Sequence, residues 1–402
     1  MKYVVFLGDG MADTPNENLG GKTPLELAKK PNIDNMVKYA KVFGMAKTVP
    51  DTLKPGSDVA NLSAMGYNPL DCYTGRSPLE AVSVGVPLND EDITFRVNLV
   101  TLSDDENYEN KEMIDYSSDE ITTPEAHELI KSVAEKLNTE ILNFYLGFSY
   151  RHILVWKGGK LSFNLTPPHD ISGRKVTDYL PKGENADVLE DLMRKSVEIL
   201  KNHPVNLKRI ERGLRPATSI WIWGEGSKAR IPDFKKMHNL SGGVISAVDL
   251  VKGIGLSAGM ECPDIEGATG NIHTNFDAKA KASIELLKKH DYVYIHLEAP
   301  DECGHRGEYE NKVRSIELID EKIVAPVLEY LNGENIPFKA LVMPDHPTPL
   351  DIKTHSRDAV PFFIYDSECK TESGITTYTE KECEKSGLYI EKAHEITNLL
   401  IK

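Results

Sequence analysis

Short apolar runs rich in β-branched residues alternate with amphipathic stretches along most of the chain. The apolar runs predict strands at 3–7, 219–223, 292–297, 339–343 and 361–365. The amphipathic stretches predict helices at 24–39, 244–253, 276–290, 308–332 and 390–401. The runs are almost continuously hydrophobic, which is typical of parallel strands covered on both faces. The expected fold class is therefore α/β, a sheet flanked by helices on both faces.

The middle of the chain has a different pattern. Residues 92–165 show the order strand, helix, strand, strand, which is typical of a small α+β unit. We therefore expect an inserted domain at 91–209. The main domain would then be discontinuous and consist of residues 1–90 and 210–402.

The charge and the cysteines narrow the function classes. The formal net charge of −15 argues against nucleic acid, because binding to a phosphate backbone depends on a basic patch. A small anionic substrate would need local cations. No apolar run is long enough to span a bilayer, so no membrane partner is expected. Five cysteines without a C-x-x-C pair indicate reduced thiols and a cytoplasmic location. The pattern makes no prediction of an oligomeric state.

Two polar stretches near the start of the chain carry candidate chemistry. Asp9 follows the first predicted strand directly, at the strand end where open α/β sheets collect ligands. The ordinary alternative is an Asp-Gly turn. Ser57 follows Pro55 and Gly56 before a helical run, so it is expected at the N-cap. It is either a capping serine or a nucleophile whose phosphorylated form would be held by the helix N-terminus.

Two later stretches add aspartates and histidines. Asp301 and His305 follow the predicted strand 292–297 and lie on one face if the segment is helical. Asp345, His346 and His355 follow the strand 339–343, where prolines favour a turn. A solvated ion pair and a polar loop are the ordinary alternatives.

Together these stretches place three aspartates, three histidines and one serine at or just beyond the carboxyl ends of predicted strands. This set is sufficient for two divalent ions. Two cations about 4 Å apart can neutralise a phosphate monoester and stabilise the attacking and leaving oxygens. A cation on Ser57 would also favour its alkoxide, so no separate general base is required.

The motifs GDGMAD, PGSDVANLSAMGY, GRSPLEA, EAPDECGH and MPDHPTP, with the later THS, resemble a known family. They are similar to the archaeal-type cofactor-independent phosphoglycerate mutases of the alkaline phosphatase superfamily of metalloenzymes. The resemblance extends over nearly the whole chain. It implies one metal held by Asp9, Ser57, Asp345 and His346, and a second held by Asp301, His305 and His355. Manganese is the expected metal, with zinc, magnesium and cobalt as alternatives.

The resemblance implies that Ser57 takes the phosphoryl group from 2- or 3-phosphoglycerate, and that the retained glycerate takes it back on its other hydroxyl. The inserted domain would bind substrate and close as a lid that excludes water. Candidate substrate contacts are Arg76, Arg96, Arg151, His152, His169 and Lys252, each with a structural role as the alternative. The bacterial long-form mutases carry an S-D-G-G-V-H-S segment in their insertion, which this chain lacks.

Three other functions fit parts of the pattern. A homoserine kinase has been proposed for a bacterial group with the same motifs, and it would retain the metals and the phosphoserine but change the acceptor. A phosphomonoesterase would transfer the phosphoryl group to water. A metal-binding scaffold without activity would tolerate loss of Ser57, whereas this chain has the serine where the chemistry requires it.

Overall fold

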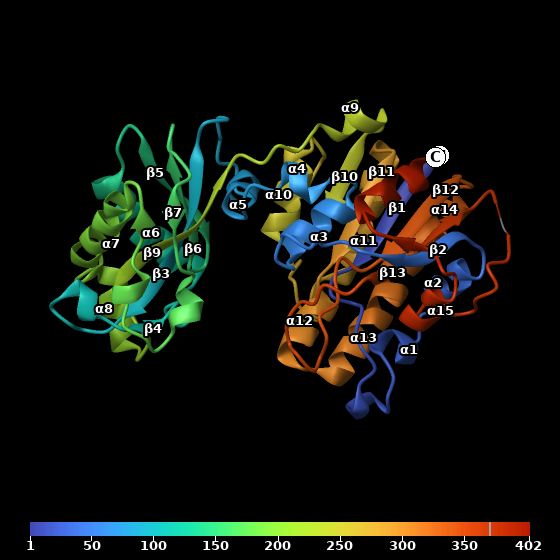
Figure 1. Cartoon of the computed structure of the whole chain (residues 1–402), viewed down its shortest axis with the longest axis horizontal. Coiled ribbons are helices and arrows are strands. Elements are labelled where there is room, and N and C mark those ends of the chain that lie inside the picture. Colours follow the sequence, from blue (N-terminus) through green and yellow to red (C-terminus); the bar gives the residue numbers. More distant parts are fainter. Residues whose placement is uncertain (370) are drawn as a thin grey trace. The chain divides into compact units, whose positions relative to one another are not determined.

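The computed structural model describes residues 1–369 and 371–402, which form two compact units (Figure 1). Unit 1 consists of Met1–Tyr73 and Arg230–Lys402, and unit 2 of Thr74–Ala229. Unit 2 contains the residues predicted as an inserted domain, 91–209, and also residues 74–90 and 210–229, which were predicted to be part of the main domain. No helix in the described residues is both long enough and apolar enough to cross a bilayer.

Unit 1 is built on a seven-stranded sheet. Its strands, in spatial order, are β10 (Gly242–Ile245), β11 (Tyr292–Leu297), β1 (Lys2–Gly8), β12 (Phe338–Met343), β13 (Val360–Asp366), β2 (Ala40–Ala46) and β14 (Tyr389–Ile390). The first four are parallel to one another. Their carboxyl ends therefore meet at one edge of the sheet, which is the edge that carries ligands in open α/β folds.

Helices cover both faces of this sheet (Figure 1), as the sequence predicts. Along β1, Val4 and Phe6 join a core formed with the helices of one face, whereas Val5 and Leu7 are equally buried but lie outside that core. Burial of alternate side chains on both faces explains the unbroken apolar run. The helices of unit 1 are α1 (Pro24–Leu27), α2 (Pro31–Val37), α3 (Ser57–Ala64), α4 (Pro69–Cys72), α9 (Phe234–His238), α10 (Asp249–Ser257), α11 (Phe276–Lys289), α12 (Ala299–Arg306), α13 (Tyr309–Ile319), α14 (Ala325–Gly333), α15 (Glu380–Glu384) and α16 (Ile396–Ile401).

Unit 2 is an α+β unit centred on the long strand β3 (Ile93–Leu102). β3 pairs antiparallel with three strands, β4 (Met113–Asp115), β6 (Arg151–Trp156) and β9 (Ser219–Ser227). β5 (Leu142–Phe148) pairs with β6, and β7 (Phe163–Asn164) forms a small ribbon with β8 (Lys182–Gly183). The helices of unit 2 are α5 (Ser77–Ser83), α6 (Thr123–Leu137), α7 (Ala186–Leu200) and α8 (Pro204–Glu211).

Two predicted strands have a different place in the fold. The run 219–223 is part of β9, which is antiparallel to β3 in unit 2 and not a strand of the main sheet. The run 361–365 lies in β13, which is antiparallel to both β12 and β2. A continuous apolar run indicates a strand covered on both faces and does not specify strand direction. The parallel arrangement that the sequence favours is found for β10, β11, β1 and β12, and β13 departs from it.

Four predicted helices have different bounds. The helix predicted at 24–39 is two short helices, because Pro31 begins α2. The segment predicted at 244–253 begins as β10 and becomes helical only at α10. The helix predicted at 308–332 contains a π-helical turn at Asp320–Val324, and 390–401 is helical only from Ala393. In each case the periodic pattern continues across a local break in the backbone.

Candidate metal centre

The candidate centre lies where three parallel strands of unit 1 end. Asp9 is the residue after β1, and its backbone N–H donates to the carbonyl of Leu297, the last residue of β11. The loop after β12 brings Asp345 and His346 to the same place, where Gly10 N–H donates to Asp345 Oδ1 over 3.1 Å. Parallel pairing of the three strands therefore brings residues that are far apart in sequence to one edge of the sheet.

The first group of side chains surrounds His346. Its Nε2 lies 3.1 Å from Ser57 Oγ, 3.3 Å from Asp345 Oδ2 and 3.5 Å from Asp9 Oδ1. Asp9, Asp345 and His346 are almost fully buried, and one ligand atom from each lies within 4.8 Å of the others. These are the four residues predicted to hold the first metal.

The second group surrounds Asp301. Its Oδ2 lies 3.3 Å from His305 Nε2, and its Oδ1 lies 3.5 Å from His355 Nε2. Asp301 and His305 both lie on α12, so the predicted helical face is confirmed. His305 Nδ1–H donates to the carbonyl of Lys353 over 3.0 Å, so Nε2 carries the lone pair in the neutral ring. The structure thus brings all seven predicted ligands together.

The geometry of the centre fits bound cations. Asp9 Oδ1 is buried without a hydrogen-bond partner within the described part of the chain. The two Nε2 atoms of His305 and His355 lie only 2.9 Å apart. A cation accepts electron density from an unpaired carboxylate oxygen and from imidazole nitrogens, so it would satisfy these atoms together.

The electrostatics around Asp9 and His346 point the same way. Burial, followed by the charges of Asp345 and Asp301, raises the pKa of Asp9 well above its usual value. Burial lowers the pKa of His346, so this ring is neutral and able to act as a ligand. Buried carboxylates that repel one another are costly unless a positive charge accompanies them. The centre therefore favours divalent cations.

Ser57 differs by one position from its prediction. The N-cap of α3 is Gly56, and Ser57 is the first helical residue, where its side chain does not cap the helix. The Ser57 hydroxyl is not used for capping and lies beside His346, which suits the nucleophile alternative better than the capping alternative. Because helix boundaries are the least certain part of a sequence prediction, the shift of one residue is an ordinary one.

His296 is a neighbour of the centre that the sequence interpretation missed. It lies on β11 and is buried, with Nε2 2.9 Å from Asp9 Oδ2 and Nδ1 3.1 Å from Ser246 Oγ. Burial lowers its pKa to about 4, so the ring is neutral and orients Asp9 through one hydrogen bond. A single polar residue inside the apolar run YVYIHL was the signal for it.

Other polar side chains also orient the candidate ligands. Asn61 Nδ2 donates to Asp345 Oδ2 over 2.8 Å and to the Ser57 carbonyl over 2.9 Å. Tyr294 O–H donates to Asn61 Oδ1 over 2.7 Å. Thr348 O–H donates to Asp301 Oδ1. These contacts depend on strand and helix register, so no single-residue pattern in the sequence indicates them.

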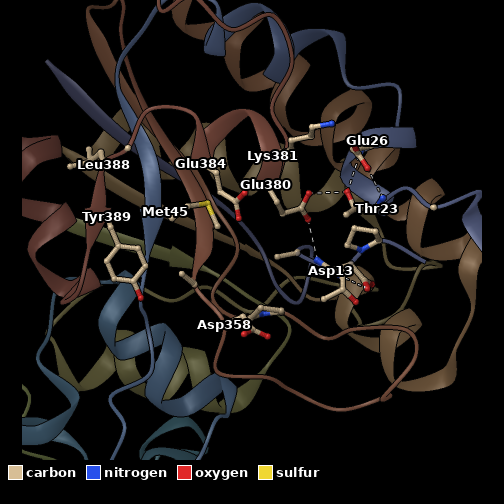
Figure 2. Close-up of a pocket in the computed structure, with 17 residues that line it drawn as sticks. Asp13, Thr23, Glu26, Met45, Asp358, Glu380, Lys381, Glu384, Leu388 and Tyr389 are labelled. Atoms are coloured by element: carbon tan, nitrogen blue, oxygen red, sulfur yellow. Dashed lines mark hydrogen bonds between the residues drawn. The ribbon is translucent and has the colours of Figure 1, made fainter. Parts of the chain in front are cut away.

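A buried ion pair behind the centre connects its two main loops. Lys312 Nζ donates to Asp13 Oδ2 over 2.7 Å and to the Thr348 carbonyl over 2.8 Å, and both charged side chains are fully buried. Glu380 accepts the Asp13 N–H over 3.1 Å and the Thr23 hydroxyl over 2.8 Å, as Figure 2 shows. Asp13, Thr23 and Glu380 border a pocket of about 690 Å³. The network fixes the segments that follow Asp9 and His346.

The predicted arginines form a cluster in unit 2. Glu80 lies between two of them, with Oε1 2.8 Å from Arg76 Nε and Oε2 2.9 Å from Arg96 Nε. Burial would raise the pKa of Glu80, but Arg96, Arg76 and Arg151 outweigh it and lower the pKa. Two arginines therefore contact one carboxylate, and the cluster keeps a positive charge that suits an anion.

The remaining candidates have distinct surroundings. His152 is buried, accepts the Gly147 N–H at Nδ1 and has its pKa lowered to about 3 by burial, so it is neutral. His169 is half exposed, with its ring 5.4 Å from the Trp223 ring in the arginine cluster. Lys252, in unit 1, forms an ion pair with Asp264.

Comparisons with known proteins agree with this geometry. The family model described as 2,3-bisphosphoglycerate-independent phosphoglycerate mutase matches residues 40–206. A 2,3-bisphosphoglycerate-independent phosphoglycerate mutase of Methanosarcina barkeri is 47% identical, and the match covers 100% of both chains.

Two solved structures share the fold over the whole chain. A protein from Pyrococcus horikoshii is 28% identical with a TM-score of 0.83, and the match covers 100% of this chain and 96% of that one. A cofactor-independent phosphoglycerate mutase from Thermoplasma acidophilum is 22% identical with a TM-score of 0.68, and the match covers 100% and 99%. The second likeness is evidence for the fold alone.

Proposed function

The chain belongs to the family of 2,3-bisphosphoglycerate-independent phosphoglycerate mutases, and from this premise we propose that it interconverts 2-phosphoglycerate and 3-phosphoglycerate through a phosphoserine at Ser57. The observation that carries the proposal is the position of the Ser57 hydroxyl, 3.1 Å from His346 Nε2 at the first turn of α3. No other hydroxyl was predicted to be the nucleophile. The proposed enzyme is an isomerase that acts by phosphoryl transfer.

We propose that two divalent metal ions, manganese by preference, complete the centre. Asp9, Ser57, Asp345 and His346 would hold one ion, and Asp301, His305 and His355 the other. Bound there, the ions would lower the pKa of the serine hydroxyl and neutralise phosphoryl oxygens. Mixed nitrogen and oxygen ligands suit manganese, and zinc, magnesium or cobalt would also fit.

The proposed reaction has two balanced transfers. Ser57 Oγ loses its proton and attacks phosphorus, the bond from phosphorus to the glycerate oxygen breaks, and that oxygen gains a proton. The other glycerate hydroxyl then loses its proton and attacks the phosphoserine, which returns Ser57 to its starting state. The N-terminus of α3 favours the negative charge that Ser57 carries between the two steps.

Unit 2 is assigned the role of substrate-binding and lid domain, because it carries the arginine cluster. In this assignment Arg76, Arg96 and Arg151 bind the anionic glycerate, and His169 contacts it as a proton carrier. His152, which is buried and neutral, would support the turn between β5 and β6. Lys252 is proposed as an anion contact in unit 1. Exclusion of water matters because water would hydrolyse the phosphoserine.

The other functions have less support. The full-length relative is named a phosphoglycerate mutase, so the homoserine kinase and phosphomonoesterase alternatives are not favoured. The proposed partner is accordingly a small phosphorylated substrate. A glycolytic reaction and a cysteine pattern without a disulfide framework support a cytoplasmic location.

A coupled assay tests the proposal. Purified protein with manganese and 3-phosphoglycerate, coupled to enolase, should turn over, and Ser57→Ala should abolish turnover. Ser63→Ala is the matched control, because Ser63 lies on the same helix and donates to the Thr48 carbonyl instead of facing the centre. Release of free phosphate without mutase product would indicate a hydrolase, and ATP-dependent phosphorylation of homoserine would indicate the kinase.

A further inference from the structure

Two arginines of unit 2 share one carboxylate in a way that fixes the direction of both. Arg76 directly precedes α5, and Glu80 lies one turn later on the same helix. Arg96 comes from β3, and its Nε approaches the second oxygen of Glu80. The side chains of Arg96 and Glu80 are only 10% and 14% exposed. One carboxylate therefore sets the orientation of two guanidinium groups from different elements.

Arg96 is held on two further sides. Its guanidinium carbon lies 4.2 Å from the ring centroid of Trp223, in a cation–π contact. Trp223 is itself fixed, because its Nε1–H donates to Asn98 Oδ1 over 2.9 Å. Gly224 follows with φ +63°, and a Cβ there would lie 3.2 Å from Arg96 Cδ. The ring, the carboxylate and the glycine together leave Arg96 little freedom.

The contacts also determine which edge of Arg96 remains for a ligand. Glu80 uses the Nε–H of Arg96, and within the described residues the two terminal nitrogens of Arg96 have no hydrogen-bond partner. The edge formed by these two nitrogens matches a carboxylate in a bidentate pair. An ordinary structural ion pair is balanced one to one, whereas here two arginines contact a single Glu80.

We propose that Glu80 and Trp223 are positioning residues that hold Arg76 and Arg96 as a preformed site for the carboxylate group of the substrate. This inference rests on the proposed function, in which the phosphoryl group is bound by the metal centre of unit 1 and the carboxylate is the other anionic group of phosphoglycerate. Preformed guanidinium groups lose little side-chain entropy on binding, so the site contributes to affinity more than to the rate of chemistry.

The kinetic test uses Glu80→Gln and Trp223→Leu in the full chain with manganese. Both variants should raise KM for 3-phosphoglycerate about tenfold or more while kcat stays within about threefold, because binding lost equally from ground and transition states changes KM alone. Trp223→Phe, which keeps an aromatic face, should recover most of the affinity. Glu190→Gln is the matched control, since Glu190 forms an i,i+4 pair with Arg194 elsewhere in unit 2 and should leave KM unchanged.

The outcomes separate a positioning role from a merely structural one. Unchanged KM in folded Glu80→Gln and Trp223→Leu would overturn the proposal, and so would a collapse of kcat at constant KM. If Glu80→Gln does not fold because Arg96 is left unpaired, Trp223→Leu decides by the same criteria. Metal content of the variants should equal that of the unmodified chain, because the cluster lies wholly in unit 2.

A binding measurement separates this inference from the mutase assignment. The metal-stripped full chain should bind D-glycerate, a carboxylate without a phosphoryl group, in a ligand-observed NMR titration. Glu80→Gln or Trp223→Leu should weaken that binding about fivefold or more. Loss of turnover with glycerate binding intact would contradict the mutase assignment and leave the carboxylate site standing. Glycerate binding that is absent, or equal in all variants, would overturn the carboxylate site.

Discussion

The candidate metal centre of unit 1 and the arginine cluster of unit 2 concentrate charge in opposite ways. In the centre, Asp9, Asp301 and Asp345 converge, and burial and mutual repulsion raise the pKa of Asp9. In the cluster, Glu80 neutralises part of the charge of the arginines. The centre therefore needs cations from outside the chain, whereas the cluster is largely stabilised by the chain itself. A buried site of one charge sign indicates a missing partner more strongly than a site whose charge is partly neutralised by the chain.

Removal of metal should give the largest difference between the two regions. Chelation is expected to lower mutase turnover by about a thousandfold or more, because the serine loses the cations that activate it. Adding metal back at one hundred times its Kd should raise the free energy of unfolding by about 2.7 kcal/mol for each ion bound. The coupled enolase assay measures the loss of turnover, and calorimetry with and without manganese measures the change in stability. Glycerate binding to the cluster should not change, and a parallel loss there would show that the two regions are not independent.

Two buried carboxyl groups give the next contrast, because their pKa values shift in opposite directions. Burial raises the pKa of Glu380 to about 7, while the arginines lower the pKa of Glu80. Because folded Glu380 holds its proton more tightly than unfolded Glu380 does, the chain loses stability as the pH rises from about 4.5 to 7. Glu380→Gln lacks this titrating group, so its free energy of unfolding should rise by about 3 kcal/mol relative to that of the unmodified chain as the pH increases over that range.

Glu80→Gln should show the opposite sign in the same denaturant titrations. Its carboxylate contributes stability above the unfolded pKa, and this contribution is lost as pH falls through the folded pKa. The substitution should destabilise the chain by about 3 kcal/mol at pH 7, since it leaves Arg96 buried without its partner. If the free energies of unfolding of Glu80→Gln and Glu380→Gln changed with pH in the same way, the opposite pKa shifts of the two carboxyl groups would be contradicted.

Loss of the residue that orients Asp9 should have a smaller effect. His296→Ala is expected to weaken metal binding by about 10- to 100-fold, because a ligand that has lost its hydrogen-bond partner is free to rotate. Isothermal titration with manganese measures the change. His238→Ala is the control, since His238 packs against Phe234 and contacts none of the candidate ligands. An equal loss of affinity in both variants would argue against an orienting role.

The smallest effect is expected at an ion pair outside both regions. Glu190 and Arg194 pair along α7 in unit 2, with side chains about one-third exposed. Glu190→Gln should change the free energy of unfolding by less than about 0.5 kcal/mol, because exposed ion pairs contribute little. Urea titration measures the change. A loss as large as that of Glu80→Gln would remove the distinction between the arginine cluster and an ordinary surface pair.

The place where the candidate ligands meet could be predicted from the sequence for a simple reason. Asp9, Asp301 and Asp345 each come shortly after an apolar run, and parallel strands bring their carboxyl ends to one edge. The runs themselves did not distinguish β9 and β13, which are antiparallel, from the parallel strands. Burial on both faces produces the same pattern in each case. Strand location was predictable, and strand partners were not.

The residues that orient the site were harder to predict. Asn61 and Thr348 act through contacts that depend on how a helix and a loop meet the sheet. Glu80 was visible only as one polar residue in GRSPLEA, and its two arginine partners come from a helix end and a strand. Arg76 and Glu80 have the i,i+4 spacing of neighbours on a helix, whereas the contact between Glu80 and Arg96 joins two elements without a fixed spacing, so periodicity carries no information about it. His296 is the exception, because a histidine inside an apolar strand requires a polar partner.

Trapping of the phosphorylated enzyme tests the central role of Ser57 most directly. The protein, loaded with manganese and mixed with 3-phosphoglycerate, is quenched within milliseconds and its peptides are analysed by mass spectrometry. Phosphate should be found on Ser57, in an amount that rises and falls with turnover, and should be absent from Ser57→Ala. Turnover without phosphate on Ser57, or phosphate on another residue, would contradict the assignment.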